Sequence, residues 1–574
     1  MRTTDLHYGM EPLFHANSRP LPGCGNGKRA VWRGFPRSQR LKVCSIERGY
    51  RMKSFVIGMG MIVLVGSATA MAQLTDKKQT PNTAGEGINK SMQEEEGVGR
   101  GDIMTPDSSM FIIKRDPFRS IRRGRQLFQR KFTMQQGLGP RTDDGVGDIE
   151  HDGSIGAGLT DSCASCHGRP RGSAGFGGDV FTRPDGRDAP HLFGLGLQEM
   201  LGDEITTDLR AIRAEALLAA RQQGKPVRRN LISKGINYGR ITALPDGSLD
   251  TSEVSGVNPD LRVRPFFAQG GTISIREFLV GAFNAEMGIE AVDPDLQAAA
   301  SGAHVVTPAG MVLDGSLDKI EAPTAHGVFD DPDGDGVVNE LPVPLVDHME
   351  FYLLNYFKPA TYRQTKGTAS GRDRFLQIGC ASCHMPDLTI NADRRVADVE
   401  TVYDPVKGIF NSLFATASGR FSAMDDHSGY PTLKTPTGQP FVVRNIFADF
   451  KRHDLGPAFH ERNFDGTMTT QFMTEPLWGV GSTAPYGHDG RSVNLQEVIL
   501  RHGGEAQASR DKFAALSDAG RADLLEFLGA LVLFPPDDTA SNLNPGDSKA
   551  PDFPQKKHGS IALTVLFNDP TDLE

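Results

Sequence analysis

The sequence contains two short stretches that decide its interpretation, Cys163-Ala-Ser-Cys166-His167 and Cys380-Ala-Ser-Cys383-His384. Both have the spacing C-x-x-C-H, in which two thiols can add across the vinyl groups of one porphyrin while the adjacent histidine reaches the iron. The alternatives are a disulfide, a zinc site, which needs four ligands at a different spacing, or a redox-active cysteine pair. A redox pair does not require a histidine after each second cysteine. The two stretches therefore predict two covalently bound c-type haems, with His167 and His384 as proximal iron ligands.

The composition agrees with a folded protein and excludes several other classes. The chain has 574 residues, of which 38% are hydrophobic and 23% are charged, which is enough for a packed core in about two to four domains. Its 65 glycines and 36 prolines indicate long loops. The net charge of −9 argues against nucleic acid as a partner, because phosphate binding needs a basic surface. Beyond residue 73 no apolar stretch approaches the ~18 residues of a membrane span.

An export signal is predicted ahead of the mature chain. Residues 53–72 read KSFVIGMGMIVLVGSATAMA, which combines a positive start, an apolar run and a small-x-small cleavage site. The alternative is a buried helix. Because signal peptides lie at the true N-terminus, we expect translation to start at Met52 and residues 1–51 to be an over-extended gene prediction. Residues 52–72 are then a signal peptide, and the mature protein is periplasmic or secreted, in keeping with haem attachment outside the cytoplasm.

The remaining sequence divides into two haem-bearing parts. We expect a mainly α fold with two cytochrome c-like haem domains and long Gly/Pro-rich loops. Helices are predicted near Met349–Phe357, Gly371–Gly379 and Leu524–Phe534. The expected parts are a flexible arm (73–114), an N-terminal haem domain (115–345), a C-terminal cytochrome c-like haem domain (346–535) and a tail (536–574).

An acidic loop in the first half has the beginning of a calcium-binding pattern. Asp331, Asp333 and Asp335 stand at alternate positions before a glycine, as in an EF-hand loop. The twelfth position is Pro342 rather than the usual glutamate, so the pattern is incomplete. Calcium and a solvated acidic turn both remain open as interpretations.

Over most of residues 120–535 the chain resembles the bacterial di-haem oxidoreductase family, which is related to di-haem cytochrome c peroxidase. The stretches that carry the resemblance are GLTDSCASCHGRPRG (158–172), HLFGLGLQEM (191–200), VNPDLRVRPF (257–266), GRDRFLQIGCASCHMP (371–386), HDLGPAF (453–459) and EPLWGVGSTAPYGHDGRSVNLQEVILRHGGEA (475–506).

The resemblance implies a second iron ligand for the C-terminal haem. In the related peroxidases the helix after T-x-P-Y-x-H-D-G carries a distal ligand, typically Met, and the same spacing here reaches His502. Leu495, Val498, Ile499 and His502 also form one face of a predicted helix. The alternative is an ordinary core histidine. An iron held by two imidazoles is closed and should have a lower potential than a His/Met iron.

The distal side of the first haem is less defined by the sequence. Reaction with peroxide or O₂ needs an open or displaceable iron position. His191 and Met200 are candidates for a displaceable ligand. Their alternatives are a surface or supporting histidine and a core methionine, respectively.

The resemblance also implies a catalytic carboxylate. The stretch from Asn284 to Gly288 resembles, one residue shorter, the N-P-x-E-M-G stretch that places a glutamate over the peroxide site of the related peroxidases. Glu286 would then move a proton between the two peroxide oxygens. The upstream aromatic-Asp-Gly of those relatives appears here as Phe267-Ala-Gln-Gly. The alternative is a solvated helix charge.

In the relatives, Thr and Pro carbonyl oxygens of the loop between the haems hold a calcium ion. Thr483 and Pro485 match those positions. His488, Asp489 and Arg491 belong to the same loop, where Asp489 and Arg491 can form an ion pair that fixes it.

Three functions follow from these features. The first is a periplasmic peroxidase, in which a small exported cytochrome or cupredoxin donates electrons to the C-terminal haem and the N-terminal haem reduces hydrogen peroxide. The second is an oxygenase that uses O₂, because secreted di-haem rubber-cleaving oxygenases share this architecture and a bis-histidine C-terminal haem. The third is an electron-transfer cytochrome with both irons closed. A glutamate over the first haem favours the peroxidase, an apolar pocket favours the oxygenase, and a strong ligand favours electron transfer.

Overall fold

The computed structural model describes residues 91–139, 160–168, 174, 179–180, 187–356, 360–361, 365–395, 440–463 and 466–532. The chain divides into two units, Met1–Thr75 and Asp76–Glu574, and every described residue belongs to the second. The predicted start at Met52, the signal peptide and the tail lie outside the described residues.

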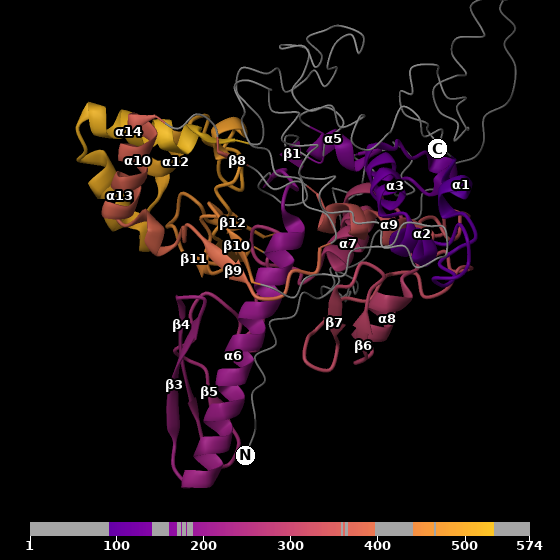
Figure 1. Ribbon diagram of the computed structural model, residues 1–574, viewed down its shortest axis with the longest axis horizontal. Coiled ribbons are helices and arrows are strands. Elements are labelled where there is room, and N and C mark those ends of the chain that lie inside the picture. The colour runs from indigo at the N-terminus through magenta and orange to yellow at the C-terminus, as the bar shows by residue number, and fades with distance from the viewer. Residues whose placement is uncertain are drawn as a thin grey trace, which may run out of the picture. The chain divides into compact units, whose positions relative to one another are not determined.

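The helices are distributed along the whole described part of the chain (Figure 1). They are α1 (Met92–Glu96), α2 (Ser109–Arg115), α3 (Pro117–Gln129), α5 (Cys163–His167), α6 (Leu195–Gln223), α7 (Ile275–Met287), α8 (Pro294–Ala300), α9 (Val343–Leu354), α10 (Lys366–Gln377), α12 (Leu495–Arg501), α13 (Gln507–Ala514) and α14 (Asp518–Gly529). Short 3-10 turns are η1 (Met134–Gln136), η2 (Cys380–Ser382), η3 (Val480–Ser482) and η4 (Gly504–Ala506).

The strands are short, and all of their pairings are antiparallel. They are β1 (Asp179–Val180), β2 (Arg187–Asp188), β3 (Val227–Ser233), β4 (Ile236–Ala243), β5 (Leu249–Asp250), β6 (His304–Val306), β7 (Val312–Asp314), β8 (Ala360–Thr361), β9 (Leu388–Ile390), β10 (Phe441–Val443), β11 (Arg452–His453), β12 (Glu461–Arg462), β13 (Met468–Thr469), β14 (Phe472–Met473) and β15 (Leu531–Val532).

The expectation of a mainly α fold is wrong. The described residues form a mixed structure in which helices alternate with seven small sheets, six of two strands and one of three. The physical reason lies in the long loops, because a backbone that crosses a protein outside helices must still pair its N–H and C=O groups. Here short ladders such as β9–β10 and β11–β14 provide those partners.

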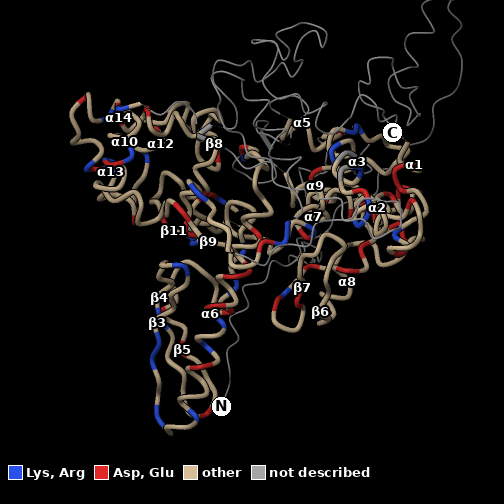
Figure 2. Tube along the Cα trace, viewed as in Figure 1, with Lys and Arg blue, Asp and Glu red and all other residues tan. Residues whose placement is uncertain are grey.

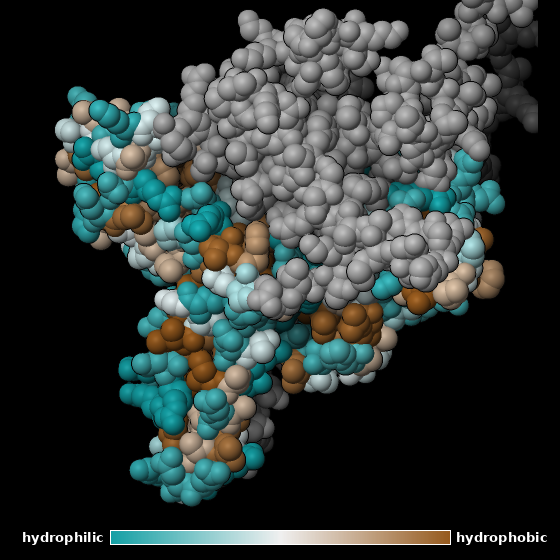
Figure 3. Space-filling model, viewed as in Figure 1, coloured by the Kyte–Doolittle hydropathy of each residue, from teal (hydrophilic) through white to brown (hydrophobic). Residues whose placement is uncertain are grey.

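The longest element, α6, runs for 29 residues and has β3, β4 and β5 alongside its C-terminal half (Figure 1). It starts after Gly194, whose φ of 78° and close approach to the Trp478 ring exclude a side chain, since a Cβ would lie 2.4 Å from that ring. Helix α6 carries both acidic and basic residues, whereas the charged residues of β3 and β4 are all basic (Figure 2). Hydrophilic and hydrophobic side chains are likewise interspersed on the visible face (Figure 3).

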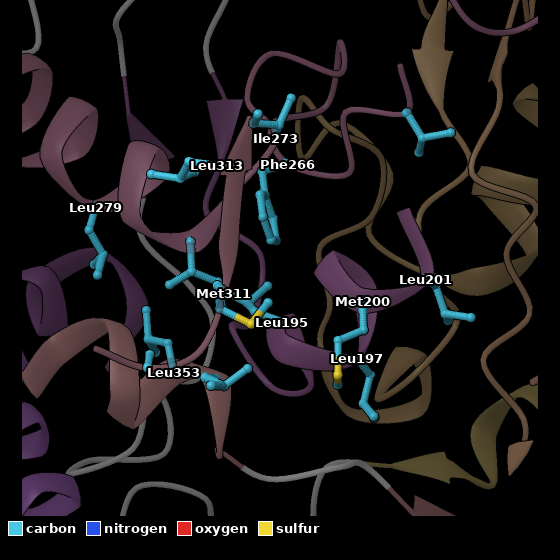
Figure 4. Close-up of a cluster of buried hydrophobic side chains, with 14 of the residues drawn as sticks. Leu195, Leu197, Met200, Leu201, Phe266, Ile273, Leu279, Met311, Leu313 and Leu353 are labelled. Carbon is cyan, nitrogen blue, oxygen red and sulfur yellow. The ribbon is translucent and has the colours of Figure 1, made fainter. Parts of the chain in front are cut away.

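The larger core is built by α3, α6, α7 and α9. Figure 4 shows part of it, with Leu197, Met200 and Leu201 of α6 among the buried aliphatic side chains. Helix α9 is buried on nearly all sides. It begins at Val343 and ends at Leu354, earlier than the predicted 349–357, because Pro342 and Pro344 favour a helix start there.

The second, smaller core joins α10 to α14. The predicted helix near 371–379 lies largely within α10, which ends at Gln377. The predicted helix at 524–534 is shifted, since α14 begins after the cap Ser517, ends at Gly529 and gives way to β15, which pairs with β8. Among the helices of the described residues, none is long and apolar enough to cross a membrane.

Candidate haem sites

The second C-x-x-C-H motif opens as the 3-10 turn η2, with Cys380 and Cys383 both free of disulfides. Burial raises the pKa of the Cys380 thiol to about 11, so it stays protonated and is unlike the thiolate that a redox pair requires. His384 donates from Nδ1 to the carbonyl of Phe447 at 3.0 Å. That bond fixes the ring and makes Nε2 the nitrogen that can reach an iron.

His502, which the sequence predicts as the second ligand, interacts electrostatically with His384. It is the C-terminal cap of α12 and donates from Nδ1 to the carbonyl of Val498 at 2.7 Å, which again leaves Nε2 to face a metal. Burial lowers the pKa of His384 to about 4, and repulsion from His502 contributes. Burial also lowers the pKa of His502. Both imidazoles are therefore neutral at pH 7, as metal ligands must be.

Aromatic rings form an apolar wall beside these histidines. Phe375, Phe447 and Phe527 contact one another edge to face, with ring centroids 5.5–5.6 Å apart. Phe375 is 6.2 Å from the His384 ring, and Phe459 is 5.2 Å from the His502 ring. Flat apolar surfaces around two oriented imidazoles fit a porphyrin ring.

The first motif is the short helix α5. His167 donates from Nδ1 to the carbonyl of Pro190 at 2.7 Å, the same arrangement as at His384 and His502. Phe128 lies 6.4 Å from its ring. Burial raises the pKa of the Cys163 thiol to about 12. No group of three possible metal ligands in the described residues includes both cysteines of one motif.

The two candidates for the distal side of the first haem are engaged elsewhere. His191 donates from Nε2 to the carbonyl of Trp478 at 2.8 Å and accepts at Nδ1 from the N–H of Phe193 at 3.2 Å. Met200 is buried in the core, and its sulfur accepts from the N–H of Arg394 at 3.2 Å. Both side chains thus have other partners, and burial, with repulsion from His167, lowers the pKa of His191 to about 4.

Glu286 lies near the C-terminal end of α7. Burial raises the pKa of its carboxyl to about 7, so it can both accept and donate a proton at neutral pH. One turn earlier, Phe283 packs edge to face on Phe132 at 5.7 Å. The N–H of Phe132 donates to the carbonyl of Asp161, two residues before Cys163. Phe283 and Phe132 thus connect α7 to the residues just before the first motif.

The acidic loop gathers more carboxylates than the sequence pattern suggested. Oxygens of Asp331, Asp333 and Asp335 lie within 4.8 Å of one another, and Asp333 forms a second such group with Glu290 and Glu340. Burial, followed by repulsion between the acids, raises the pKa of Glu290 to about 7 and of Glu340 to about 8. Glu290 could not be found from sequence, because it lies 50 residues before Glu340.

Thr483 and Pro485 follow η3 in the loop after Trp478. Among the described residues, none of the groups of three possible metal ligands includes their neighbours, so the structure adds no acidic ligands to this predicted calcium position. Asp489 forms an ion pair with Arg501, and the Nε of Arg491 lies 3.6 Å from the same Asp489 carboxylate oxygen. His488 instead stacks on Phe472 with centroids 3.9 Å apart.

Three charged residues beside the second motif were missed at the sequence level. Asp449 and His453 offer ligand atoms within 4.8 Å of the Cys383 sulfur, and His453 bonds to Glu505. On this side an open pocket of about 550 Å³ is lined by Ser382, Met385, Asp449 and Lys451 together with the beginning of β4. Its lining includes neither His384 nor His502.

Comparisons with known proteins agree with the haem assignment. Residues 388–531, about a quarter of the chain, match the family described as "Di-haem oxidoreductase, putative peroxidase". No curated protein matches the chain. Among solved structures, hydrazine synthase of Kuenenia stuttgartiensis, pressurised with xenon, is similar at 16% identity, over 33% of this chain and 55% of that chain. Its TM-score of 0.19 carries no argument about fold or function.

The family match includes His502 and the block 475–506 on which the resemblance was based. The predicted resemblance is thus confirmed over the C-terminal part of the chain, where residues 388–531 match the di-haem oxidoreductase family.

Proposed function

We propose that this protein is an exported di-haem peroxidase, with one haem attached to Cys163 and Cys166 and the other to Cys380 and Cys383. When bound, the haems would supply the redox chemistry. Electrons would enter at the second haem from a small exported cytochrome or cupredoxin, and hydrogen peroxide would be reduced at the first. The chain itself holds and orients the haems, and its side chains move protons at the substrate. The export signal predicted at 52–72 supports a periplasmic or secreted location.

The observation that carries this proposal is an asymmetry between the two motifs. At the second, His384 and His502 are each oriented by a backbone carbonyl, and the two rings are near enough to interact electrostatically. At the first, only His167 has this arrangement among the candidates, because His191 and Met200 are bound to other groups. A second haem with both axial positions filled, together with a first haem with one position open, would suit an enzyme that takes up electrons at the second haem and binds substrate at the first.

Glu286 supports peroxide rather than O₂ as the oxidant. Breaking the O–O bond to give water requires a proton to move from one oxygen to the other, and a carboxyl with a pKa of about 7 can do both halves of that transfer. The oxygenase needs no such carboxylate. It remains the second candidate, because the pairing of His384 with His502 is also what the resemblance to rubber-cleaving oxygenases implies.

Oxidant consumption separates these functions. We expect the purified two-haem protein, mixed with a reduced small cytochrome and hydrogen peroxide, to oxidise two cytochromes for each peroxide removed, because each peroxide takes up two electrons and two protons to become water. A stopped-flow spectrometer and a peroxide electrode would record both. Consumption of O₂ but not of peroxide would support the oxygenase, and consumption of neither would support an electron-transfer cytochrome.

We also infer that the acidic loop holds calcium through Asp331, Asp333 and Asp335, with Glu290 and Glu340 in the place of the missing glutamate at the twelfth loop position. Carboxylate oxygens from two or more segments are what calcium prefers. Burial first, and then repulsion from Asp333, raises the pKa values of Glu290 and Glu340, and a bound cation would offset both effects. The calcium position at Thr483 and Pro485 remains a prediction from the resemblance.

Calcium should change how stability depends on pH. Without it, Glu290 and Glu340 keep their protons up to about pH 7 and pH 8 in the folded state, whereas the unfolded chain loses them near pH 4.3. The folded state then binds more protons, so the free energy of unfolding should fall as pH rises from about 5 to about 8. Calcium should offset this loss, giving a larger rise in Tm at pH 8 than at pH 5.

Thermal unfolding with calcium or with a chelator would measure the effect. Asp333→Asn should abolish most of the calcium-dependent rise in Tm, because Asp333 belongs to both carboxylate groups. Asp246→Asn is a matched control in an exposed turn, where the carboxylate bonds only locally to Ser248. An equal rise in Tm for Asp333→Asn and the unaltered protein would contradict the calcium site.

A further inference from the structure

His453 is a buried histidine that lies between the two segments carrying the predicted ligands of the second haem. It is 6% exposed and ends β11. Nδ1 lies 2.8 Å from a carboxylate oxygen of Glu505, and Nε2 lies 2.9 Å from one of Asp449. Ionised carboxylates only accept hydrogen bonds, so both ring nitrogens donate and the ring is an imidazolium.

Each carboxylate belongs to a different ligand-bearing segment. Asp449 follows by two residues Phe447, whose carbonyl holds the Nδ1 of His384. Glu505 follows His502 by three residues. The ring of His453 therefore bridges the backbone that orients one imidazole to the loop that carries the other. Asp449 and His453 also approach the Cys383 sulfur, so this bridge adjoins the attachment point as well.

Backbone contacts make the bridge continuous. The other oxygen of Glu505 accepts from the N–H of Asp454 at 3.0 Å, and the N–H of Glu505 donates to the Asp454 carbonyl at 2.9 Å. The N–H of Gly503 donates to the Leu455 carbonyl at 2.8 Å. At Gly504, with φ of 49°, a Cβ would lie 2.1 Å from the Asp454 carbonyl, so the two segments are in direct backbone contact.

We propose that His453 is a positioning residue of the second haem, which fixes the spacing of His384 and His502 through Asp449 and Glu505. The proposal rests on the ligation of that haem by His384 and His502 put forward above. A bound metal ligand set must be held to within about 0.5 Å of its working geometry, and neither His384 nor His502 has a side-chain partner of its own to do this in the described residues. The charged bridge supplies that rigidity through the segments that carry Asp449 and Glu505.

The test is the spin state of the purified protein with two haems per chain. His453→Phe keeps the ring volume but removes both hydrogen bonds. We expect the ratio of high-spin to low-spin second haem to rise about tenfold or more, because a hydrogen bond to a charged group is worth at least that factor. Added free imidazole should restore the low-spin spectrum. His460→Phe is the matched control, since His460 bonds only to Asp454 and bridges no ligand-bearing segment.

Two further variants separate the possible outcomes. His502→Gly should give a fully high-spin second haem, and if it does not, the ligation by His502 fails rather than the role of His453. Glu505→Gln removes the charge and one of the two acceptor oxygens at this end of the bridge, at a half-exposed position, so it tests the idea even if His453→Phe does not fold, and its spectrum should shift in the same direction. If His502→Gly becomes high-spin while both His453→Phe and Glu505→Gln keep the wild-type spectrum, the proposed role of His453 is overturned.

Discussion

Replacing Cys163 and Cys166 with alanine is expected to remove one haem, and replacing Cys380 and Cys383 to remove the other. The thioether bonds are the predicted covalent attachment of each porphyrin, so a chain without the thiols should lose its haem during purification. The pyridine haemochrome assay should count two haems in the unaltered chain, one in each pair variant and none when all four cysteines are replaced.

The matched controls are Ser165→Ala and Ser382→Ala, because each serine lies between the two cysteines of its motif without contributing a thiol. Both variants should retain two haems. A count other than two in the unaltered protein, or an undiminished count in either pair variant, would contradict the attachment.

The two losses should differ in their effect on folding. The first motif adjoins a large core shared by α3, α6, α7 and α9. The second adjoins a cluster of only eight buried hydrophobic residues, Phe375, Ile378, Phe447, Phe513, Leu524, Phe527, Leu528 and Leu531. Such a small core needs a further stabilising element, and a haem against the phenylalanine wall provides it. Loss of the second haem should therefore lower Tm more than loss of the first.

The proposed iron ligands could be named from the sequence because their signals are local. C-x-x-C-H places two thiols and a histidine within five residues, and His502 was found from its spacing within one continuous block. The bridge around His453 was not accessible, since Asp449 and Glu505 are separated by more than 50 positions and carry no motif. Glu290 was missed for the same reason. These pairs are created by packing, which a local pattern does not contain.

The error in fold class has a related origin. Strand β9 at 388–390 pairs with β10 at 441–443, across a stretch of about 50 residues, and neither is longer than three residues. Periodicity requires longer runs to be visible. The start of helix α9 was placed too late for a different reason. The helix is buried on nearly all sides, so its hydrophobic residues form no single stripe that would mark where it begins.

The second large effect is expected on the rate of the reaction with hydrogen peroxide, when Glu286 is replaced. Glu286→Gln should slow the reaction with hydrogen peroxide by about 10²- to 10⁴-fold, which is the usual contribution of a positioned acid–base group. Glutamine keeps the size of the side chain but can neither take a proton from one peroxide oxygen nor deliver it to the other. Haem content and the spectrum of the second haem should be unchanged, because Glu286 belongs to α7 and contacts neither His384 nor His502 through any described bond.

The rate of the reaction with peroxide should also change with pH, in a direction set by the pKa of Glu286. Burial raises the pKa of Glu286 to about 7, and the ionised form must take the first proton, so the rate in the unaltered protein should increase as pH rises through about 7. In Glu286→Gln that increase should disappear along with the rate. Glu215→Gln, the same substitution at an exposed position of α6, should retain both the rate and its pH dependence. Stopped-flow mixing from pH 5 to pH 9 would measure all three proteins. A haem-replete Glu286→Gln protein with an unaltered rate would remove this carboxylate from the reaction, and the assignment of peroxide as the oxidant would then lose its main structural support.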